Sequence, residues 1–292
     1  MRLFVFGYGY SAEAAVRRLR SRFSWIGGTT RSAEKADLMR ADGIEAYLFD
    51  GSAPGAGVAD AVRQATHVLV SIAPSEAGDG DRVLRRHGAD LSIGRKPMAV
   101  CYLSTVGVYG DHGGAWVDER TRLKPSSARS VARAEAEKAW TAYGETTGVA
   151  TSILRLSGIY GPGRNAFVNL AEGSAKRLIK PGQVFNRIHV DDIAAAIEEA
   201  LLRRASGVFN ITDDEPAPPQ DVVSFAADLM GVEPPPEQAF DTATLSPMAR
   251  SFYGENKRVA NGKSKRELGM TYRYPTYREA LGAMWREGNW RD

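Results

Sequence analysis

The chain has 292 residues and an apolar content of 43%, which suffices for one large α/β domain or for a nucleotide-binding domain with a smaller partner. Lys and Arg number 38 against 35 Asp and Glu, the formal net charge is +3, and no dense basic cluster occurs, so we expect no nucleic-acid partner. The chain opens directly in a strand-like run, without a charged leader or a long apolar stretch. This predicts a cytoplasmic protein that does not bind membranes.

The first predicted strand, residues 1–6, leads into a glycine-rich turn and then into a helical pattern. The turn reads G-x-G-x-x-A: Gly7 permits a tight turn, Gly9 leaves room for a pyrophosphate, and Ala12 lets the helix approach the sheet. The N-terminus of that helix offers free N–H groups to phosphates. The pattern therefore predicts a dinucleotide site. Its expected residues are Gly7, Gly9, Tyr10, Ser11 and Ala12.

The end of the second predicted strand, residues 25–32, indicates which dinucleotide binds. A site selective for NAD usually carries Asp or Glu here, because a carboxylate accepts hydrogen bonds from the ribose. In this chain Thr30 is neutral and Arg31 is cationic, which suits the 2′-phosphate of NADP. We expect NADP, with NAD as the alternative. Arg31 could instead be a solvated loop residue that stacks on adenine.

Further strands are predicted at residues 44–49, 67–72, 97–104, 150–156 and 207–212. Asp50 follows the first of them and either meets the adenine edge or is an exposed loop carboxylate. Ile72, Ala73 and Pro74 at the end of the next would border the inner half of the cofactor. Cys101 lies in an apolar run and is predicted to be a buried core residue. Strands separated by helix-length segments predict an α/β fold with a doubly wound parallel sheet.

Three strings further along the chain are distinctive. They are Val108-Tyr109-Gly110, Ile159-Tyr160-Gly161-Pro162-Gly163-Arg164 and Arg187-Ile188-His189-Val190-Asp191-Asp192. With the glycine-rich turn, they resemble the extended and atypical branches of the short-chain dehydrogenase/reductase superfamily, which includes epimerases and dehydratases that use NAD. The resemblance covers nearly the whole chain and is weak from residue 215 onward.

The resemblance implies a Rossmann domain with a smaller C-terminal substrate lobe. The Rossmann domain would span residues 1–165 and continue through 186–212, and the lobe would comprise 166–185 and 213–292. The resemblance also implies that Thr105, four residues before the Tyr of the V-Y-G triplet, binds the substrate oxygen. The residues expected around the substrate are Tyr109, Tyr160, Asn165, Arg187 and His189.

The Tyr-x-x-x-Lys pair that usually exchanges the proton in this superfamily is missing. Residues 125–127 form a helix start signal, and in the helix that follows Arg129 takes the Tyr position and Arg133 the Lys position. Arg stays protonated, so Arg129 is a poor general acid or base. Arg129 could still clamp an anion, or both arginines could be solvated. A literal Tyr-x-x-x-Lys, Tyr253 to Lys257, is interpreted as a coincidence of spacing, with a substrate contact as the alternative.

Two further helix starts can be read from the sequence. Asp191 or Asp192 is predicted to cap a helix that runs to Arg203, and the neighbouring His189 is interpreted as structural, with a substrate contact or a proton relay as the alternative. Pro275-Thr276-Tyr277-Arg278-Glu279 has the spacing of a capping box and predicts the last helix.

These observations leave three hypotheses. The first is an NADP-dependent oxidoreductase or epimerase/dehydratase-like enzyme for a small carbonyl or sugar-nucleotide substrate, in which Thr105, Arg129 and Arg133 are the catalytic candidates. The second is a catalytically inactive sensor of NADP(H), favoured by the loss of the Tyr/Lys pair. The third is a scaffold with a vestigial site, against which the intact glycine-rich turn argues. We expect a small-molecule substrate, no metal, and a monomer or homodimer.

Overall fold

The computed structural model describes residues 1–94 and 96–291, with the backbone alone for residues 247–249. Its centre is a seven-stranded parallel sheet in the order β11-β7-β5-β4-β1-β2-β3. Its strands are β1 (Arg2–Phe6), β2 (Trp25–Thr30), β3 (Glu45–Leu48), β4 (His67–Val70), β5 (Ala99–Thr105), β7 (Ala150–Leu156) and β11 (Gly207–Ile211). Each lies where the sequence predicts a strand, which confirms the doubly wound α/β fold.

Successive side chains of the central strand β1 enter different cores. Leu3 and Val5 pack on one face of the sheet, and Phe4 and Phe6 pack on the other. The cause is the pleat, which points neighbouring side chains to opposite faces. Both faces are therefore buried under helices, which is typical of parallel sheets. Cys101 of β5 is fully buried, as predicted.

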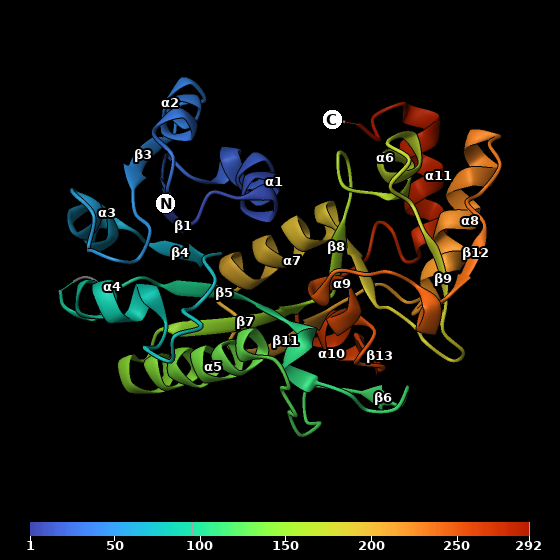
Figure 1. Cartoon of the computed structure of the whole chain (residues 1–292). Helices are drawn as coiled ribbons and strands as arrows, with labels where there is room; N and C mark the ends of the chain where they lie inside the picture. Colours follow the sequence, from blue (N-terminus) through green and yellow to red (C-terminus); the bar gives the residue numbers. More distant parts are fainter. Residues whose placement is uncertain (95, 292) are drawn as a thin grey trace.

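The helices form a layer on each face of the sheet (Figure 1). One layer contains α1 (Tyr10–Leu19), α2 (Ala33–Ala41) and α7 (Val190–Leu202), and the other contains α3 (Val58–Gln64), α4 (Arg82–Ser92) and α5 (Ala128–Thr147). In α7 the buried residues Ile193, Ile197 and Leu201 are spaced by four, so they form one apolar stripe against the sheet.

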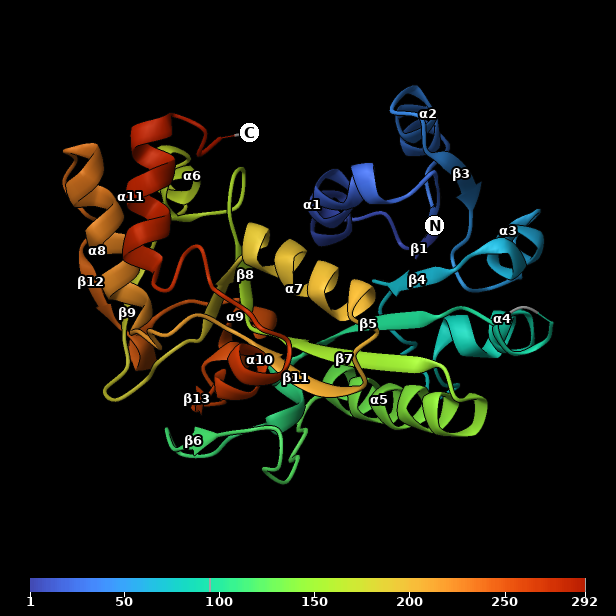
Figure 2. The ribbon, with the colours of Figure 1, turned by 180° about the vertical axis from the view of Figure 1, so that it is seen from behind.

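A second group of elements stands to one side of the sheet, as the view from behind shows (Figure 2). It includes β8 (Gly158–Tyr160), α6 (Ala166–Ala171), β9 (Arg177–Ile179), β10 (Arg187–His189), α8 (Pro219–Met230), β12 (Glu237–Ala239) and α11 (Tyr277–Glu287). Phe167, Tyr277, Leu281 and Met284 give this group a core of its own. We refer to this group as the second lobe; it includes β8 and β10, which lie in the residues that the sequence assigns to the Rossmann domain.

The remaining elements are short. They are η1 (Arg20–Arg22), η2 (Val106–Tyr109), β6 (Trp116–Val117), η3 (Phe240–Thr242), α9 (Pro247–Phe252), β13 (Arg258–Val259) and α10 (Gly262–Glu267). Strand β13, from the C-terminal part of the chain, pairs in parallel with β6, which follows the fifth strand of the Rossmann domain.

Two predicted helix starts are confirmed. Ser127 caps α5 by accepting a hydrogen bond from the Ser130 N–H at 3.1 Å. Thr276 caps α11 by accepting from the Arg278 N–H at 3.2 Å, and its hydroxyl donates to a carboxylate oxygen of Glu279. In each case a short hydroxyl side chain satisfies an N–H group of the first turn that has no partner within the helix.

The predicted cap of α7 is wrong. The capping residue is His189, whose Nδ1 accepts from the Asp191 N–H at 3.2 Å. His189 has extended backbone angles, as a capping residue does, whereas Asp191 and Asp192 already lie in the first turn. The Asp192 carboxylate instead accepts from the backbone N–H groups of Arg273, at 2.7 Å, and Tyr274, at 3.1 Å. It thereby fixes the chain before α11 to α7.

Candidate functional site

The turn between β1 and α1 requires glycine at its first position. Gly7 has a φ of +87°, and a Cβ there would lie 2.7 Å from Cγ1 of Ile72. Its N–H donates to Oγ1 of Thr29 at 2.8 Å, so the turn is held against the second strand. Ile72 thus packs directly on the turn, beside the position predicted for the cofactor. Ala73 is exposed, and Pro74 is buried.

The second glycine of the turn faces open space. A Cβ on Gly9 would have no heavy atom within 4 Å, and no side chain caps the helix that begins after it. The first N–H groups of a helix have no partner within the helix, so those of Tyr10, Ser11 and Ala12 are available to a ligand. A pyrophosphate fits this position, because it needs both close approach to the backbone and N–H donors.

The side chain of Tyr10 crosses from the glycine turn to the second lobe. Its hydroxyl donates to the carbonyl of Pro162 at 2.8 Å, in the loop that follows β8. Burial raises the pKa of Tyr10 to about 12, so the hydroxyl keeps its proton and stays a donor. Tyr10 therefore brings a backbone group to the predicted phosphate position and a side chain to the other lobe.

The end of β2 presents a free cation. Arg31 is exposed, and within residues 1–94 and 96–291 its side chain has no ion pair or hydrogen bond. Lys35, one helical turn further, lies with its Nζ 3.6 Å from a carboxylate oxygen of Glu13. Oγ1 of Thr30 accepts from the N–H of Ser32 at 3.3 Å. The geometry thus leaves Arg31 available to an anion.

Asp50 lies at the same edge of the sheet, just after β3, and is exposed. Its carboxylate accepts from the Oγ of Ser52 at 2.6 Å and from the N–H of the same residue at 2.8 Å. These hydrogen bonds lower the pKa of Asp50. Because β1, β2, β3 and β4 are neighbours in a parallel sheet, their carboxyl ends bring the predicted cofactor residues to one edge.

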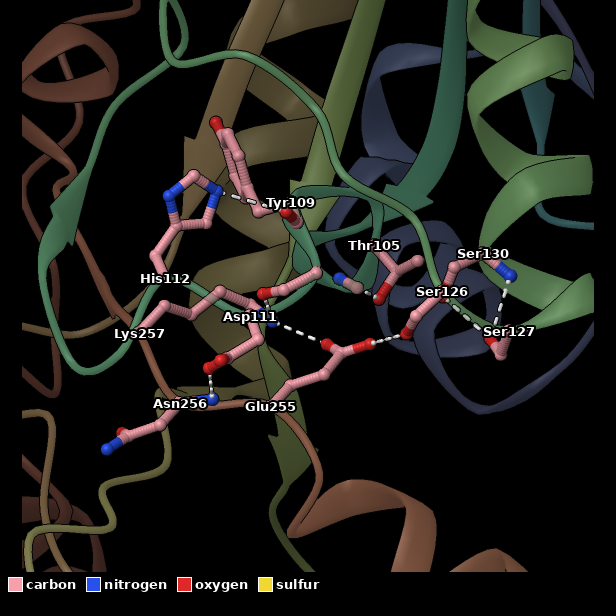
Figure 3. A network of polar contacts seen from close by, with 12 residues as sticks. Thr105, Tyr109, Asp111, His112, Ser126, Ser127, Ser130, Glu255, Asn256 and Lys257 are labelled. Carbon is pink, nitrogen blue, oxygen red and sulfur yellow. Dashed lines mark hydrogen bonds and ion pairs between the residues drawn. The ribbon is translucent and has the colours of Figure 1, made fainter.

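At the end of β5, Thr105 retains a hydroxyl proton for a ligand. Its Oγ1 accepts from the N–H of Gly107 at 3.1 Å, and the side chain is half-buried. A Cβ on Gly107 would lie 3.2 Å from Oγ of Ser130 and 3.4 Å from Oγ1 of Thr105, so both hydroxyls flank this glycine. Ser127 donates to Oγ of Ser130 at 2.9 Å (Figure 3). The start of α5 is therefore rich in hydroxyl groups.

The two arginines at the positions of the missing pair have different surroundings. Arg129 is exposed, and its guanidinium lies 5.4 Å from the ring centre of Phe252 in α9. Arg133 is half-buried, and its Nη1 donates to the carbonyl of Leu103 at 2.6 Å and to the hydroxyl of Tyr102 at 3.0 Å. Arg133 is thus tied to β5, and only Arg129 is free to meet a ligand.

The second Tyr-x-x-x-Lys sequence brings its lysine, not its tyrosine, to the turn that follows β5. Nζ of Lys257 lies 2.6 Å from Oε2 of Glu255 and donates to the carbonyl of Gly110 at 2.8 Å. Oε1 of Glu255 accepts from Oγ of Ser126 at 3.0 Å (Figure 3). Tyr253 instead packs in a separate aromatic cluster. Sequence spacing pointed to Lys257 but could not show this contact.

Tyr109, expected near the substrate, is fully buried. Its hydroxyl donates to Oδ1 of Asn210 at 2.8 Å and accepts from Nη1 of Arg155 at 2.9 Å. Arg155 also forms a buried ion pair with Glu137 at 2.7 Å. The V-Y-G triplet therefore places its tyrosine in a polar network inside the protein, and we leave Tyr109 out of the proposed site.

Three of the other expected substrate residues, Tyr160, Asn165 and Arg187, help to line a cavity of about 530 Å³ in the second lobe. Asn165 has no free group there: its Nδ2 donates to the carbonyls of Gly161 and Trp290 at 2.8 and 2.7 Å. Its Oδ1 accepts two N–H groups at the start of α6, at 3.0 and 3.2 Å. Asn165 therefore shapes the loop beside the cavity.

His189 lies next to Tyr160, with ring centres 5.4 Å apart, but it is not part of the cavity wall. Burial lowers the pKa of His189 to about 4, so the ring is neutral at physiological pH. Because its Nδ1 accepts a hydrogen bond, the proton resides on Nε2, which has no partner among the described residues. The geometry makes His189 a helix cap, as the structural interpretation expects.

Among residues 1–94 and 96–291, no group of three or more His, Cys, Asp or Glu side chains is placed to hold a metal ion. Within the same described part of the chain, no helix has the length and apolar character needed to span a bilayer.

Comparison with known proteins places these features in context. Residues 82–212 match the model of the NAD dependent epimerase/dehydratase family. A functionally unknown conserved protein from Silicibacter pomeroyi, whose structure is solved, is 45% identical over 98% of this chain and 99% of that chain, with a TM-score of 0.86. Protein YeeZ of Escherichia coli (strain K12) is 25% identical over 93% of this chain and 95% of its own. A 3-diazoavenalumate denitrifying reductase from a Streptomyces species is 29% identical over 44% of this chain and 45% of its own.

Proposed function

We propose that this chain, which belongs to the NAD-dependent epimerase/dehydratase family, is an NADP(H)-dependent oxidoreductase that acts on a small carbonyl substrate. The observation that carries the proposal is the open space beside Gly9 at the uncapped start of α1, with the unpaired Arg31 at the end of the neighbouring strand. The partial relative named as a reductase supports redox chemistry. A cytoplasmic location and a monomeric or dimeric state remain predictions.

The residues present fit this cofactor. The N–H groups at the start of α1 would hold the pyrophosphate, and Arg31 would pair with the 2′-phosphate. Ile72 and Ala73 would border the inner half of the cofactor, because they lie at the end of β4 beside the glycine turn. When bound, the nicotinamide supplies or accepts a hydride.

Thr105 would orient the substrate oxygen. Its Oγ1 already accepts from the Gly107 N–H, so its hydroxyl proton is free to be donated. A hydrogen bond to an oxygen that gains negative charge is stronger in the transition state than in the ground state, and therefore accelerates the reaction. Since Thr105 is half-buried, water can reach it and deliver the proton that the missing tyrosine would supply.

A second candidate function is binding of NADP(H) without turnover. It is favoured by one specific observation: Arg133, at the position of the usual lysine, has its Nη1 bound to the carbonyl of Leu103 and to the hydroxyl of Tyr102. Arg129, at the position of the tyrosine, carries a guanidinium group in place of a phenol and lies near Phe252. Such a protein would keep the site that binds the phosphates of the cofactor but would have no group that exchanges a proton with a substrate.

One experiment separates these functions. NADPH and NADH are titrated by fluorescence, and NADPH oxidation is then followed with a panel of small carbonyl compounds and sugar nucleotides. Tight NADPH binding together with oxidation by one of these compounds supports the oxidoreductase. Tight NADPH binding without oxidation by any of them supports the sensor, and absence of binding by either nucleotide contradicts both.

A further inference from the structure

The loop 161–164, which follows β8, forms part of the wall of the cavity in the second lobe. Its residues Gly163 and Arg164 line that cavity. Gly161 and Arg164 exchange two backbone hydrogen bonds of 3.0 Å, so the loop is a tight turn. The N–H of Gly163 donates to the carbonyl of Trp290, after α11, at 3.0 Å. On this side the loop is therefore attached to the second lobe.

Tyr10 attaches the same loop to the glycine turn. Its hydroxyl donates to the carbonyl of Pro162 at 2.8 Å, across 152 positions of the chain. The loop is shaped around this hydroxyl. A Cβ on Gly161 would lie 2.6 Å from the hydroxyl oxygen of Tyr10 and 2.7 Å from Cγ1 of Val190. A side chain at position 161 would therefore displace the tyrosine from the carbonyl that it binds.

The backbone of Tyr10 lies at the other end of this connection. Tyr10 is the first residue of α1, and Gly9 before it has no side chain that could cap the helix. The N–H groups of this first turn have no partner within the helix, so a phosphate can accept hydrogen bonds from them. A phosphate bound there would restrict the backbone that carries the Tyr10 side chain. The same residue thus reaches the phosphate position and the wall of the cavity.

We propose that Tyr10 is a positioning residue that couples the two lobes. A dinucleotide whose pyrophosphate lies at the start of α1 stabilises the hydrogen bond from Tyr10 to Pro162, and thereby slows the opening of the loop 161–164. Coupling between two sites is reciprocal, so loosening the loop weakens nucleotide binding by the same factor. The proposal rests on the proposed function in taking NADPH as the nucleotide at the glycine turn. It holds equally for a protein that binds NADPH without turnover.

Hydrogen exchange of single amides tests the coupling in the full chain, with and without saturating NADPH. The reporters are the N–H groups of Gly161, Gly163 and Arg164, because each of them donates a backbone hydrogen bond that must open before exchange. We expect NADPH to slow their exchange about two- to tenfold, which is the effect of one neutral hydrogen bond.

Tyr10→Phe removes the hydroxyl and keeps the ring. NADPH should still bind, at most about tenfold more weakly, and at saturation it should no longer slow exchange in the loop. The matched control is Tyr143→Phe. The hydroxyl of Tyr143 also donates to a backbone carbonyl, that of Leu91 at 2.9 Å, but in the core on the other face of the sheet. This variant should keep the full effect of NADPH on the loop.

A second probe identifies the part of the nucleotide that acts on Tyr10. The probe is 2′-phospho-ADP-ribose, which contains the pyrophosphate and lacks the nicotinamide. It should slow exchange in the loop as NADPH does. Slowing by NADPH alone would overturn the proposal, because the coupling would then run through the nicotinamide.

Three further outcomes would also overturn it. They are an absence of slowing in the wild type, slowing that persists in Tyr10→Phe, and an increase in loop exchange in Tyr10→Phe that is equal with and without NADPH. The last result would show a hydrogen bond that only stabilises the fold.

The same measurements separate this proposal from the proposed function. If NADPH slows the loop through Tyr10 but no carbonyl compound oxidises it, the oxidoreductase fails and the coupling stands. If NADPH is oxidised by a carbonyl compound but does not slow the loop, the coupling fails and the oxidoreductase stands. If neither NADPH nor NADH binds, both fail.

Discussion

Nζ of Lys257 donates to the carbonyl oxygen of Gly110 at 2.8 Å, although 147 positions separate the two residues. Gly110 ends the turn that begins at Thr105, so a side chain from the C-terminal part of the chain braces the strand end where the substrate oxygen is proposed to bind. Glu255 completes the contact, since it pairs with Lys257 and accepts from Ser126 before α5. These hydrogen bonds and this ion pair therefore link the turn after Thr105 to the C-terminal part of the chain.

Lys257→Met should therefore destabilise the protein. It leaves Glu255 without its ion-pair partner at a site where the lysine side chain is only 7% exposed, and breaking a buried pair from one side costs about 2–4 kcal/mol here. Urea unfolding followed by circular dichroism measures the change. The control is Lys138→Met, whose lysine is 70% exposed and pairs with Glu135 on the surface. Equal stability of both variants would contradict a bracing role.

Gly9→Val should fold and lose dinucleotide binding. The backbone of Gly9 is extended, with φ −103° and ψ −175°, so valine adopts it without strain. Its methyl groups would occupy the open space in which the pyrophosphate approaches α1. Fluorescence titration with NADPH measures the loss, and circular dichroism checks the fold. Unchanged affinity in the folded variant would place the phosphates elsewhere.

Arg31 should determine the preference for NADPH over NADH. A charge-assisted contact to a phosphate contributes about 1.5–3 kcal/mol, so Arg31→Ala should erase a preference of roughly tenfold or more. Titration of both nucleotides with both proteins measures it. Lys35→Ala is the neighbouring comparison, and its effect should be smaller because Lys35 already lies near Glu13. Tighter binding of NADH by the wild type would refute the expectation.

Thr105→Val tests turnover without changing the shape of the side chain. The variant loses the hydroxyl proposed to bind the reacting oxygen, so kcat should fall by about one to two orders of magnitude, with NADPH affinity nearly unchanged.

Arg129→Ala should instead raise KM more than it lowers kcat, if this exposed arginine holds an anionic group of the substrate throughout the reaction. Full activity in both variants would mean that the reaction occurs at another place.

Asp213 should make stability depend on pH. Burial raises its pKa to about 8 from an ordinary value of 3.8, so between these values the folded chain keeps a proton that the unfolded chain has lost. Its contribution to stability is complete below pH 3.8 and is lost as the pH rises towards 8, with a slope of at most about 1.4 kcal/mol per pH unit.

The window from pH 6.5 to 8 is the cleanest for this test. His67 and His189 both have pKa values lowered to about 4 by burial, so the slope that they add is half its maximum at their ordinary value of 6.5, fades as the pH rises, and is the same in wild type and Asp213→Asn. Asp213→Asn should flatten the urea midpoint against pH in this window, whereas the exposed Asp221→Asn should not. An equal slope in wild type and Asp213→Asn would show that the carboxyl is ionised when buried.

Local patterns predicted the sheet and the conformation of the glycine turn, because their information is contained in short stretches. The role of Gly7 follows from a tight turn, and the exposure of Arg31 follows from its place at a strand end. The cap of α7 could not be read in this way: His189 and Asp191 compete over one turn, and only the backbone angles decide between them.

Contacts between distant segments were beyond the reach of the sequence. Nothing near Tyr109 indicates that Arg155 and Asn210 enclose its hydroxyl, and nothing near Tyr277 indicates that it shares a cavity with Arg187. Such placements depend on the packing of whole elements, which composition and periodicity do not encode.

The pairing of β13 with β6 has a consequence for the architecture as a whole. Asn186 extends the same junction, since its Nδ2 donates to the carbonyl of Lys257 and its Oδ1 accepts from the N–H of Val259, at 2.9 and 2.8 Å. The chain therefore returns to its first half after building the second lobe, and each part completes hydrogen bonds of the other. Hydrogen bonds thus join the two ends of the chain at this junction, and a cut that removed residues 256–259 would leave backbone and side-chain groups of the first half without these partners.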